Sequence, residues 1–558
     1  MNLRRQEHQE LLNIIASNCE IPMNGIDLDQ SIEFAELALQ RSTDEYLRLK
    51  AFELKTSWLL ITGRHQDALN TGLSCLKENG LELTERLPSP KIPKAPLSPK
   101  NQAIWSIKKM IGDAAFVADP SKLTPAQFSQ IECHYKYGPG PLSSNALCSI
   151  SLYYISTGDI ETAYRLGRKA IEILSDSAPT TRTTVLNIYN GHLHHWKHPL
   201  KEIIKPLREA YRYGLRSGEY LFMSYAAVHS CDAMLITGSE LDLIQNHCRE
   251  YQKVFSALGN EYAICYSKIT ETLAARLAGM KTESASIEDL ISANNYTAAW
   301  HKLTADTVAE YLLSPESEEV VKKAKSAAAY KEAAPGFFTI PVHNLYYSLA
   351  LINQYQNAFS QDRENIFSVI KKNQKESKSW TDIAPMNKYK YELVEAEIAR
   401  VTGDVAKANE FYMLAIEGAS KQGYIPDKAL VKTLAGEFYL KQSDDKGVIN
   451  IRESASLYEK WGALAIVERL KTKHFRFLES EVELTQEFIK AIENNFWDNV
   501  SFNIKMLLKS LKVEVEYDSH SQKIYLIISR DTESIIRPLL TKIKKQVSFR
   551  ISTKIIHN

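Results

Sequence analysis

The chain has 558 residues and carries 68 Lys+Arg against 67 Asp+Glu, so its formal net charge is +1. Hydrophobic residues make up 44% and charged residues 24%, which are ordinary values for a folded soluble protein and exclude wholesale disorder. The balanced charge argues against a protein that is basic throughout, as many nucleic-acid binders are, and the 22 glycines are few enough to favour helices with short connections.

The cysteines and the N-terminal sequence indicate the cellular compartment of the protein. The seven cysteines are scattered without a CxxC pair, as is typical of reduced thiols in a reducing compartment. The N-terminal sequence MNLRRQEHQELLN becomes polar again before an apolar region forms, so it does not predict a secretory signal. No stretch approaches the roughly 18 apolar residues of a membrane span. We therefore expect a soluble, cytoplasmic protein.

A repeated spacing first occurs in residues 57–76 and recurs in 146–174 and 393–418. Each segment has a glycine, a small alanine five residues later, and another small residue twelve after the glycine. A glycine that ends one helix and small residues seven apart on the next helix allow two helices to pack closely. The spacing predicts helix pairs of the tetratricopeptide (TPR) type, stacked into a superhelix. The three sets are Gly63, Ala68 and Cys75; Gly158, Ala163 and Ala170; and Gly403, Ala408 and Ala415.

Residues 87–100, LPSPKIPKAPLSPK, hold five of the 19 prolines. This composition predicts an extended, exposed loop between helices, because proline cannot continue a helix. The alternative is a docking ligand for the aromatic groove of a partner.

Further helices are predicted downstream. Residues 200–216 place apolar side chains at helical spacing, and Pro206 within them predicts a helix start or a kink. Gly218, Gly238 and Gly259 recur at intervals typical of helix ends. Residues 340–356 and 427–442 are also predicted to be helical. The predicted fold class is thus all-α, a TPR-like α-solenoid over residues 1–480 followed by connecting helices over 481–510.

The last 60 residues differ in character. Residues 499–558 carry a net charge of +6, which leaves −5 on the rest of the chain. We predict strands at 513–517, 524–528 and 547–556, the first two forming a hairpin, and a helix at 533–545. Together they form a small basic α/β element over residues 511–558.

The densest basic cluster of this element could attract an acidic protein face, an anionic membrane or nucleic acid. We expect a protein face, or the acidic solenoid of the same chain, before nucleic acid. A merely solvated basic face is the alternative. The cluster consists of Lys542, Lys544, Lys545, Arg550 and Lys554.

Four segments carry a recognisable pattern of residues. They are His195-Trp196-Lys197-His198-Pro199-Leu200 with Pro206 to Glu219; Ile340-Pro341-Val342-His343 with Tyr346; Trp380 with Ala384-Pro385-Met386-Asn387 and Tyr391 to Glu397; and Tyr458 with Trp461-Gly462-Ala463. In this order they resemble the helical middle region of very large bacterial signalling proteins, over roughly residues 25–475. One departure is Glu219, where the family has Asp.

The resembled proteins join a serine/threonine-kinase-like domain, a STAND-type AAA ATPase, this helical region, a GAF domain and a histidine kinase. The chain shows no phosphate-binding loop, kinase motif set or histidine-kinase motif, and residues 476–558 do not look like a GAF domain. We expect a relative that kept only the solenoid, or a fragment; Met1 and the distinct C-terminal element favour the first. The resemblance implies a role in signalling, with a signalling kinase or ATPase among the expected partners.

Four histidines, His192, His194, His195 and His198, lie within seven residues. His194, His195 and His198 have offsets that can share a metal on a helix. Because no carboxylate or cysteine completes the set nearby and Pro199 follows directly, we expect no metal or other cofactor. The main interpretation is that His195 and Trp196 pack between helices; sensing of pH is a further alternative.

Aromatic side chains on the concave face of a solenoid would make good contacts for a partner. The candidates are Trp196, Tyr211, Tyr213, Tyr346, Trp380 and Tyr391, and for each of them core packing is the alternative.

No GxSxG nucleophile motif is present. We expect a non-catalytic signalling scaffold or sensor whose groove binds a protein partner, a peptide or a small regulatory ligand. Two other readings stay open. One is a bacterial effector that engages host proteins through its repeats. The other is an enzyme with an unrecognised site in the groove or in the C-terminal element.

Overall fold

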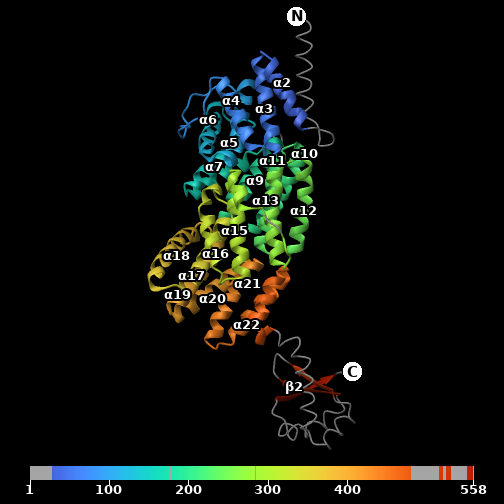
Figure 1. Ribbon diagram of the computed structural model, residues 1–558, viewed down its shortest axis with the longest axis vertical. Helices are drawn as coiled ribbons and strands as arrows, with labels where there is room; N and C mark the ends of the chain where they lie inside the picture. The colour runs from blue at the N-terminus through green and yellow to red at the C-terminus, as the bar shows by residue number, and fades with distance from the viewer. Residues whose placement is uncertain are drawn as a thin grey trace, which may run out of the picture. The chain divides into compact units, whose positions relative to one another are not determined.

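The computed structural model describes residues 28–174, 179–282, 285–478, 514–518, 523–529 and 550–556. The chain separates into two units, Met1–Val467 and Glu468–Asn558. The first is built of helices packed in pairs, which confirms the predicted TPR-like α-solenoid (Figure 1). The predicted connecting helices over 481–510 lie outside the described residues.

Most helices pack against the next helix in the chain. The α-helices are Leu28–Arg41 (α2), Glu45–Ile61 (α3), His65–Glu78 (α4), Pro99–Ala118 (α5), Pro120–Tyr137 (α6), Ser143–Ser156 (α7), Ile160–Glu172 (α8), Pro179–Ile188 (α9), Ile204–Ser217 (α10), Tyr220–Thr237 (α11), Leu241–Ala257 (α12), Glu261–Leu277 (α13), Ile287–Ser292 (α14), Tyr296–Leu313 (α15), Glu318–Ala328 (α16), Thr339–Asn357 (α17), Ser360–Thr381 (α18), Lys388–Thr402 (α19), Val405–Gln422 (α20), Ile425–Lys441 (α21), Lys446–Trp461 (α22), Leu464–Lys473 (α23) and Phe475–Leu478 (α24). Short π or 3-10 turns are Tyr189–Leu193 (η1), His194–Trp196 (η2), Leu200–Ile203 (η3), Lys331–Ala333 (η4) and Pro385–Asn387 (η5).

The glycine spacing that predicted the repeats is confirmed. Gly63, Gly158 and Gly403 have φ values of +75°, +85° and +84°, in the left-handed region that allows the chain to turn after a helix. All six small residues at the two following offsets are at most 1% exposed. The glycines therefore end the first helix of each pair, and the small side chains let the second helix approach it.

Other predicted helices are confirmed as well. Pro206 lies in the first turn of α10. Residues 340–356 fall in α17, and residues 427–442 fall in α21 up to Lys441, with Gln442 as its C-cap. The proline-rich segment 87–100 has no regular structure before α5 begins at Pro99, as predicted. It runs along α6, where the backbone N–H of Ala95 donates to the carbonyl oxygen of Lys136 at 2.8 Å.

The structure bears on two expectations from the sequence, which concern the state of the cysteines and the lack of a membrane-spanning segment. The six described cysteines are free thiols, and five of them are buried. Among the helices in the described ranges, none combines the length and apolar character needed to cross a membrane.

Alternate helices form a continuous inner row. Helix α11 packs on α13, α13 on α15, α15 on α17 and α17 on α19, while α12, α16, α18 and α20 cover them from outside. This two-row arrangement is typical of helical-repeat superhelices.

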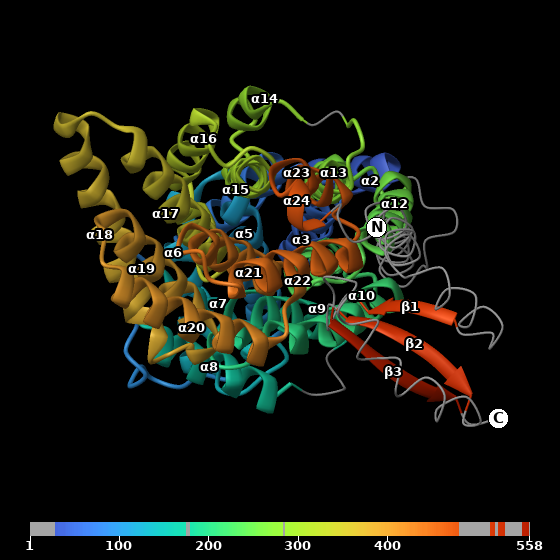
Figure 2. The same ribbon diagram turned by 90° about the horizontal axis from the view of Figure 1, so that it is seen from below.

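The superhelix closes on itself where α21 meets α11. The hydroxyl of Tyr424, just before α21, accepts a hydrogen bond of 2.6 Å from the backbone N–H of Leu200. Gly238, after α11, lies so close to Ile425 that an added Cβ would stand 2.6 Å from the Cβ of Ile425. Figure 2 shows α21 and α22 returning toward α10 and α12. The inner row therefore surrounds an interior space.

The segment around His195 and Trp196 packs in the core. The ring Nε2–H of His195 and the indole N–H of Trp196 both bond to the carbonyl oxygen of Gly336, at 2.7 and 3.1 Å. Gly336 has φ +72°, and a Cβ there would lie 2.8 Å from the carbonyl oxygen of His192. The Trp196 and Trp380 rings pack edge to face, with centroids 5.7 Å apart. His195, Val342 and Met386 also line one small cavity, so the first three of the four segments that carry the resemblance lie in the same region of the solenoid.

The second unit contains a three-stranded sheet in the order β1-β2-β3. Strands Glu514–Asp518 (β1) and Lys523–Ser529 (β2) pair antiparallel with Glu514 opposite Ile527, which confirms the predicted hairpin. Strand Arg550–Ile556 (β3) pairs parallel to β2. A parallel pair needs a crossover connection, and the helix predicted at 533–545 falls in that connection, outside the described residues.

The closure of the superhelix can be tested with two glycines. Each of them directly follows a helix, and each has a positive φ. Gly238 has φ +91° and touches Ile425 and Pro426, whereas Gly218 has φ +77° and no atom within 4 Å of an added Cβ. Gly218→Ala should cost about 1–2 kcal/mol, the strain of a left-handed alanine. Gly238→Ala should cost at least about 1 kcal/mol more, because it also separates α11 from α21. Urea unfolding checks this, and equal losses would contradict the closing contact.

Candidate ligand-binding site

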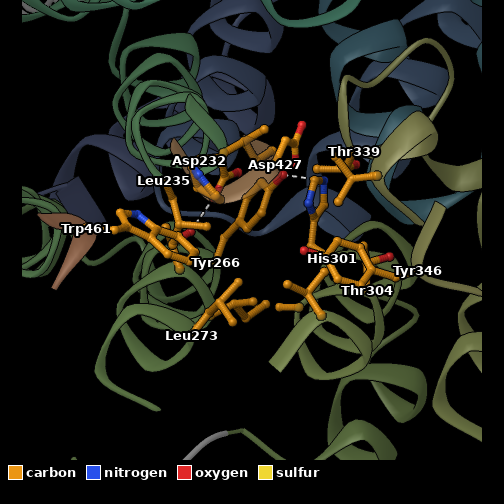
Figure 3. A pocket seen from close by; sticks show the side chains of 17 residues that line it. Asp232, Leu235, Tyr266, Leu273, His301, Thr304, Thr339, Tyr346, Asp427 and Trp461 are labelled. Carbon is orange, nitrogen blue, oxygen red and sulfur yellow. Dashed lines mark hydrogen bonds between the residues drawn. The ribbon is translucent and has the colours of Figure 1, made fainter. Parts of the chain in front are cut away.

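A cavity lies between six helices of the solenoid: α11, α13, α15, α17, α21 and α22 (Figure 3). About 70 Å³ inside it is open to the centres of water-sized molecules, which leaves room for several waters. Apolar side chains form much of the wall, among them Leu235, Leu273, Val308 and Val342. An apolar hollow with a few polar groups is the usual form of a site for a small ligand or a single peptide side chain.

Asp232, on α11, is the principal polar group of this cavity. Its Oδ1 accepts a hydrogen bond from the hydroxyl of Thr270 on α13. Its Oδ2 is buried and has no hydrogen-bond partner among the described residues. Burial raises the pKa of this carboxyl to about 7, although the bond from Thr270 acts in the opposite direction. One carboxylate oxygen is therefore left for a donor that the chain does not supply.

Two more buried polar atoms of the cavity lack a partner within the part of the chain that the structure describes. They are the indole Nε1 of Trp461 and the hydroxyl of Thr304, whose residues are 1% and 4% exposed. A buried polar atom without a partner costs about 1–3 kcal/mol. A bound molecule or ordered water would satisfy them.

The charge of a second carboxylate, Asp427 on α21, is already balanced by a neighbouring lysine. Lys390 donates to its Oδ2 at 2.8 Å, and the hydroxyl of Tyr389 donates to the same oxygen. The side chains of Lys390 and Asp427 are only 6% and 7% exposed, so this is a buried ion pair. The comparison leaves Asp232 as the carboxyl of this cavity that is available to a ligand.

His301 lines the cavity on α15 beside Tyr266, and the ring Nε2 shares a hydrogen bond with the hydroxyl of Tyr266. Burial lowers the pKa of His301 to about 3, so its ring is neutral near pH 7 and cannot balance the charge of Asp232. Tyr266 and His301, bonded to each other, form a polar part of the cavity wall.

The predicted aromatic contact residues separate into two groups. Trp196 and Trp380 are 2% and 7% exposed and pack on each other, so the alternative of core packing describes them and the prediction as open groove contacts is wrong for both. Tyr346 is also buried, but it lines the cavity.

The other three aromatic candidates lie away from the cavity. Tyr211 is half-buried against Tyr251, with ring centroids 4.7 Å apart. Tyr213 is 36% exposed and lies under the guanidinium of Arg182, and Tyr391 is half-buried on α19. None of the three lines the cavity described above.

Of the predicted basic cluster, Lys542, Lys544 and Lys545 lie outside the described residues. Arg550 and Lys554 belong to β3, opposite Lys523 and Ile527 of β2. The role of this cluster therefore stays a prediction.

The histidine cluster divides between core and surface. His192 and His195 are buried and bond to the carbonyl oxygens of Pro335 and Gly336. His194 and His198 stack, with ring centroids 4.4 Å apart, and Glu202 lies beside them. The expectation that no nearby carboxylate completes the set is therefore wrong, because the turn at Pro199 and η3 bring Glu202 back to the rings.

One feature of the sequence marks the cavity. Asp232 is the only charged residue in α11, which reads YLFMSYAAVHSCDAMLIT. A lone carboxylate in an otherwise uncharged helix indicates a buried acid, which structures keep for a partner or a function. Trp461 belongs to the fourth segment that carries the resemblance, but neither Trp461 nor His301 signals a place beside Asp232, because their meeting depends on how the superhelix winds.

Comparisons with known proteins add little. No family profile and no curated protein matches the sequence. Among solved structures, a Rap protein complexed with competence and sporulation factor is 11% identical, with 75% of this chain and 99% of that chain covered and a TM-score of 0.34. A circular tandem repeat protein of novel repeat topology is 12% identical, covers 84% and 97%, and has a TM-score of 0.12. Both TM-scores are too low to support an argument, so the site rests on its own geometry.

The state of Asp232 predicts a pH dependence. Its pKa is about 7 in the fold against an ordinary 3.8, so between these values the folded state holds a proton that the unfolded chain has released. Stability is therefore lost as the pH rises through this range. Asp232→Asn keeps the acceptor for Thr270 and removes this loss. Its stabilising effect should grow by about 2 kcal/mol from about pH 5 to about pH 8.

Urea unfolding at the two pH values measures this difference. Asp382→Asn, at an exposed position after α18, is the matched control and should show no such growth. A pH-independent effect of Asp232→Asn would mean that the carboxyl titrates normally.

Proposed function

We propose that this chain is a non-catalytic helical-repeat sensor that binds a ligand in the cavity between α11 and α21. The observation that carries the proposal is the meeting of three buried, unpartnered polar atoms, at Asp232, Thr304 and Trp461, in one apolar hollow of the described chain. Their residues come from α11, α15 and α22, which are far apart in the sequence. A ligand that satisfied them would connect the middle of the solenoid to its end.

The chemistry of the wall favours a ligand with a positively charged nitrogen on an apolar body. Such a nitrogen can donate to the free Oδ2 of Asp232, and its charge would favour the ionised carboxyl. The apolar side chains around it would bury a carbon chain or an aromatic ring. A small amine and a lysine or arginine side chain of a peptide both meet this description.

Binding would act on a partner through the shape of the solenoid. The cavity walls belong to the inner row of helices and to the returning helices α21 and α22. A ligand that binds one arrangement of these helices more tightly shifts the population toward it. The resemblance to the helical region of bacterial signalling proteins supports a signalling partner such as a kinase or an ATPase, to which the altered surface would be presented.

Binding can be tested with phenethylamine and hexylamine as probes and with phenethyl alcohol and hexanol as uncharged controls. The amines should raise the thermal unfolding temperature of the full chain by a few degrees at concentrations well above Kd, and the alcohols should not. Asp232→Asn should remove the response, while Asp382→Asn should keep it. Equal responses to amine and alcohol, or an amine response that survives Asp232→Asn, would contradict the assigned role of Asp232.

A further inference from the structure

A second cluster of polar side chains lies at the junction between α9 and α10, away from the cavity. His194 lies in η2, His198 lies two residues after η2 ends, and Glu202 lies in η3. One ligand atom from each of the three lies within 4.8 Å of the others. We propose that these three residues form a site for a divalent transition metal ion, Zn²⁺ in particular.

The backbone explains why the three side chains meet despite Pro199. The N–H of His198 bonds to the carbonyl oxygen of His194 at 3.1 Å, which closes one turn and places the two rings on the same side. The N–H of Glu202 bonds to the carbonyl oxygen of Pro199 at 3.0 Å and starts the next turn in the same place. The proline redirects the chain without separating the ligands.

The distances suit a metal with nitrogen and oxygen ligands. Two ligand atoms on a tetrahedral zinc ion lie about 3.3–3.4 Å apart, given bond lengths of about 2.0–2.2 Å. The Nε2 of His194 is 3.3 Å from the Oε2 of Glu202, and the Nδ1 of His198 is 3.9 Å from the same oxygen. The nitrogens of His194 and His198 lie within 4.8 Å of each other, so the rings must turn toward a shared ion to bind it. Two histidines and one glutamate form an established zinc ligand set that leaves a position for water.

The surroundings support this assignment of nitrogen atoms. The hydroxyl of Tyr164, on α8, lies 2.8 Å from the Nε2 of His198. A ligating imidazole typically donates its other N–H to a fixed acceptor, so Tyr164 would orient the ring and leave Nδ1 for the metal. The neighbouring Lys197 is paired with Glu161 at 2.7 Å, so its charge is partly balanced. The side chains of His194, His198 and Glu202 are 17%, 39% and 52% exposed, so an ion can reach them from solvent.

A bound ion would fix the segment that enters the core. His195 and Trp196 lie between the ligands in sequence and bond to Gly336. Linking η2 to η3 through a metal restrains this segment on both sides of Pro199. We therefore expect the ion to raise the thermal stability of the protein without any requirement for the ligand of the central cavity.

The test uses the full chain without an affinity tag, stripped of metal and titrated with Zn²⁺ in competition with a chromogenic chelator. One equivalent of Zn²⁺ should bind and raise the unfolding temperature. His198→Ala and Glu202→Gln should each weaken binding by at least about tenfold. Co²⁺ in the same site should give visible absorption bands of a four-coordinate N/O complex, and these bands should be lost in both variants.

The matched control is His247→Ala, because His247 is another half-buried histidine and bonds to Arg208. It should leave the affinity and the cobalt spectrum unchanged. Unchanged Zn²⁺ affinity in both ligand variants would overturn the proposal, as would an equal loss in His247→Ala. Glu202 is exposed, so Glu202→Gln is expected to fold and decides the matter if His198→Ala is unstable.

Discussion

The contact of α21 with α11 is the constraint on which the interior of the solenoid depends. An open superhelix would leave the inner row of helices in water, where Asp232 and the indole of Trp461 could be hydrated. Because Tyr424 bonds to the backbone at Leu200 and Gly238 lies against Ile425, the row is closed and these polar groups are buried. Closure turns a helical surface into a cavity. It also removes the unpartnered polar atoms from water, so that leaving them without a hydrogen bond costs free energy.

Close approach of backbones is achieved by the smallest side chains. Alanines and glycines at the fixed offsets allow each pair to form, and the same device recurs at longer range at Gly238 and Gly336. At both of these positions a positive φ and a near neighbour coincide, so any side chain would bring strain and a clash together. The scarcity of glycine in the chain is thus compatible with a strict requirement for it where the superhelix turns or closes.

Local structure could be predicted from the sequence because its causes are local. The offsets after Gly63, Gly158 and Gly403 depend on helix geometry alone, and the alternation around Val515 depends on strand geometry. The cavity could not be predicted in the same way. Asp232, Thr304 and Trp461 are brought together by the cumulative rotation of successive pairs, which no periodicity encodes. Glu202 is different: it lies four residues after His198, a helical offset, but Pro199 between them removes the continuous helix on which that offset depends.

The segment from His192 to Leu200 connects these features physically. At one end it is bonded to Pro335 and Gly336, which lead directly into α17 and thus to Thr339 and Tyr346 of the cavity wall. At its other end Leu200 is bonded to Tyr424, beside the residues that α21 contributes to the opposite wall. A ligand that changed the separation of α17 and α21 would have to strain these bonds or move the segment with them.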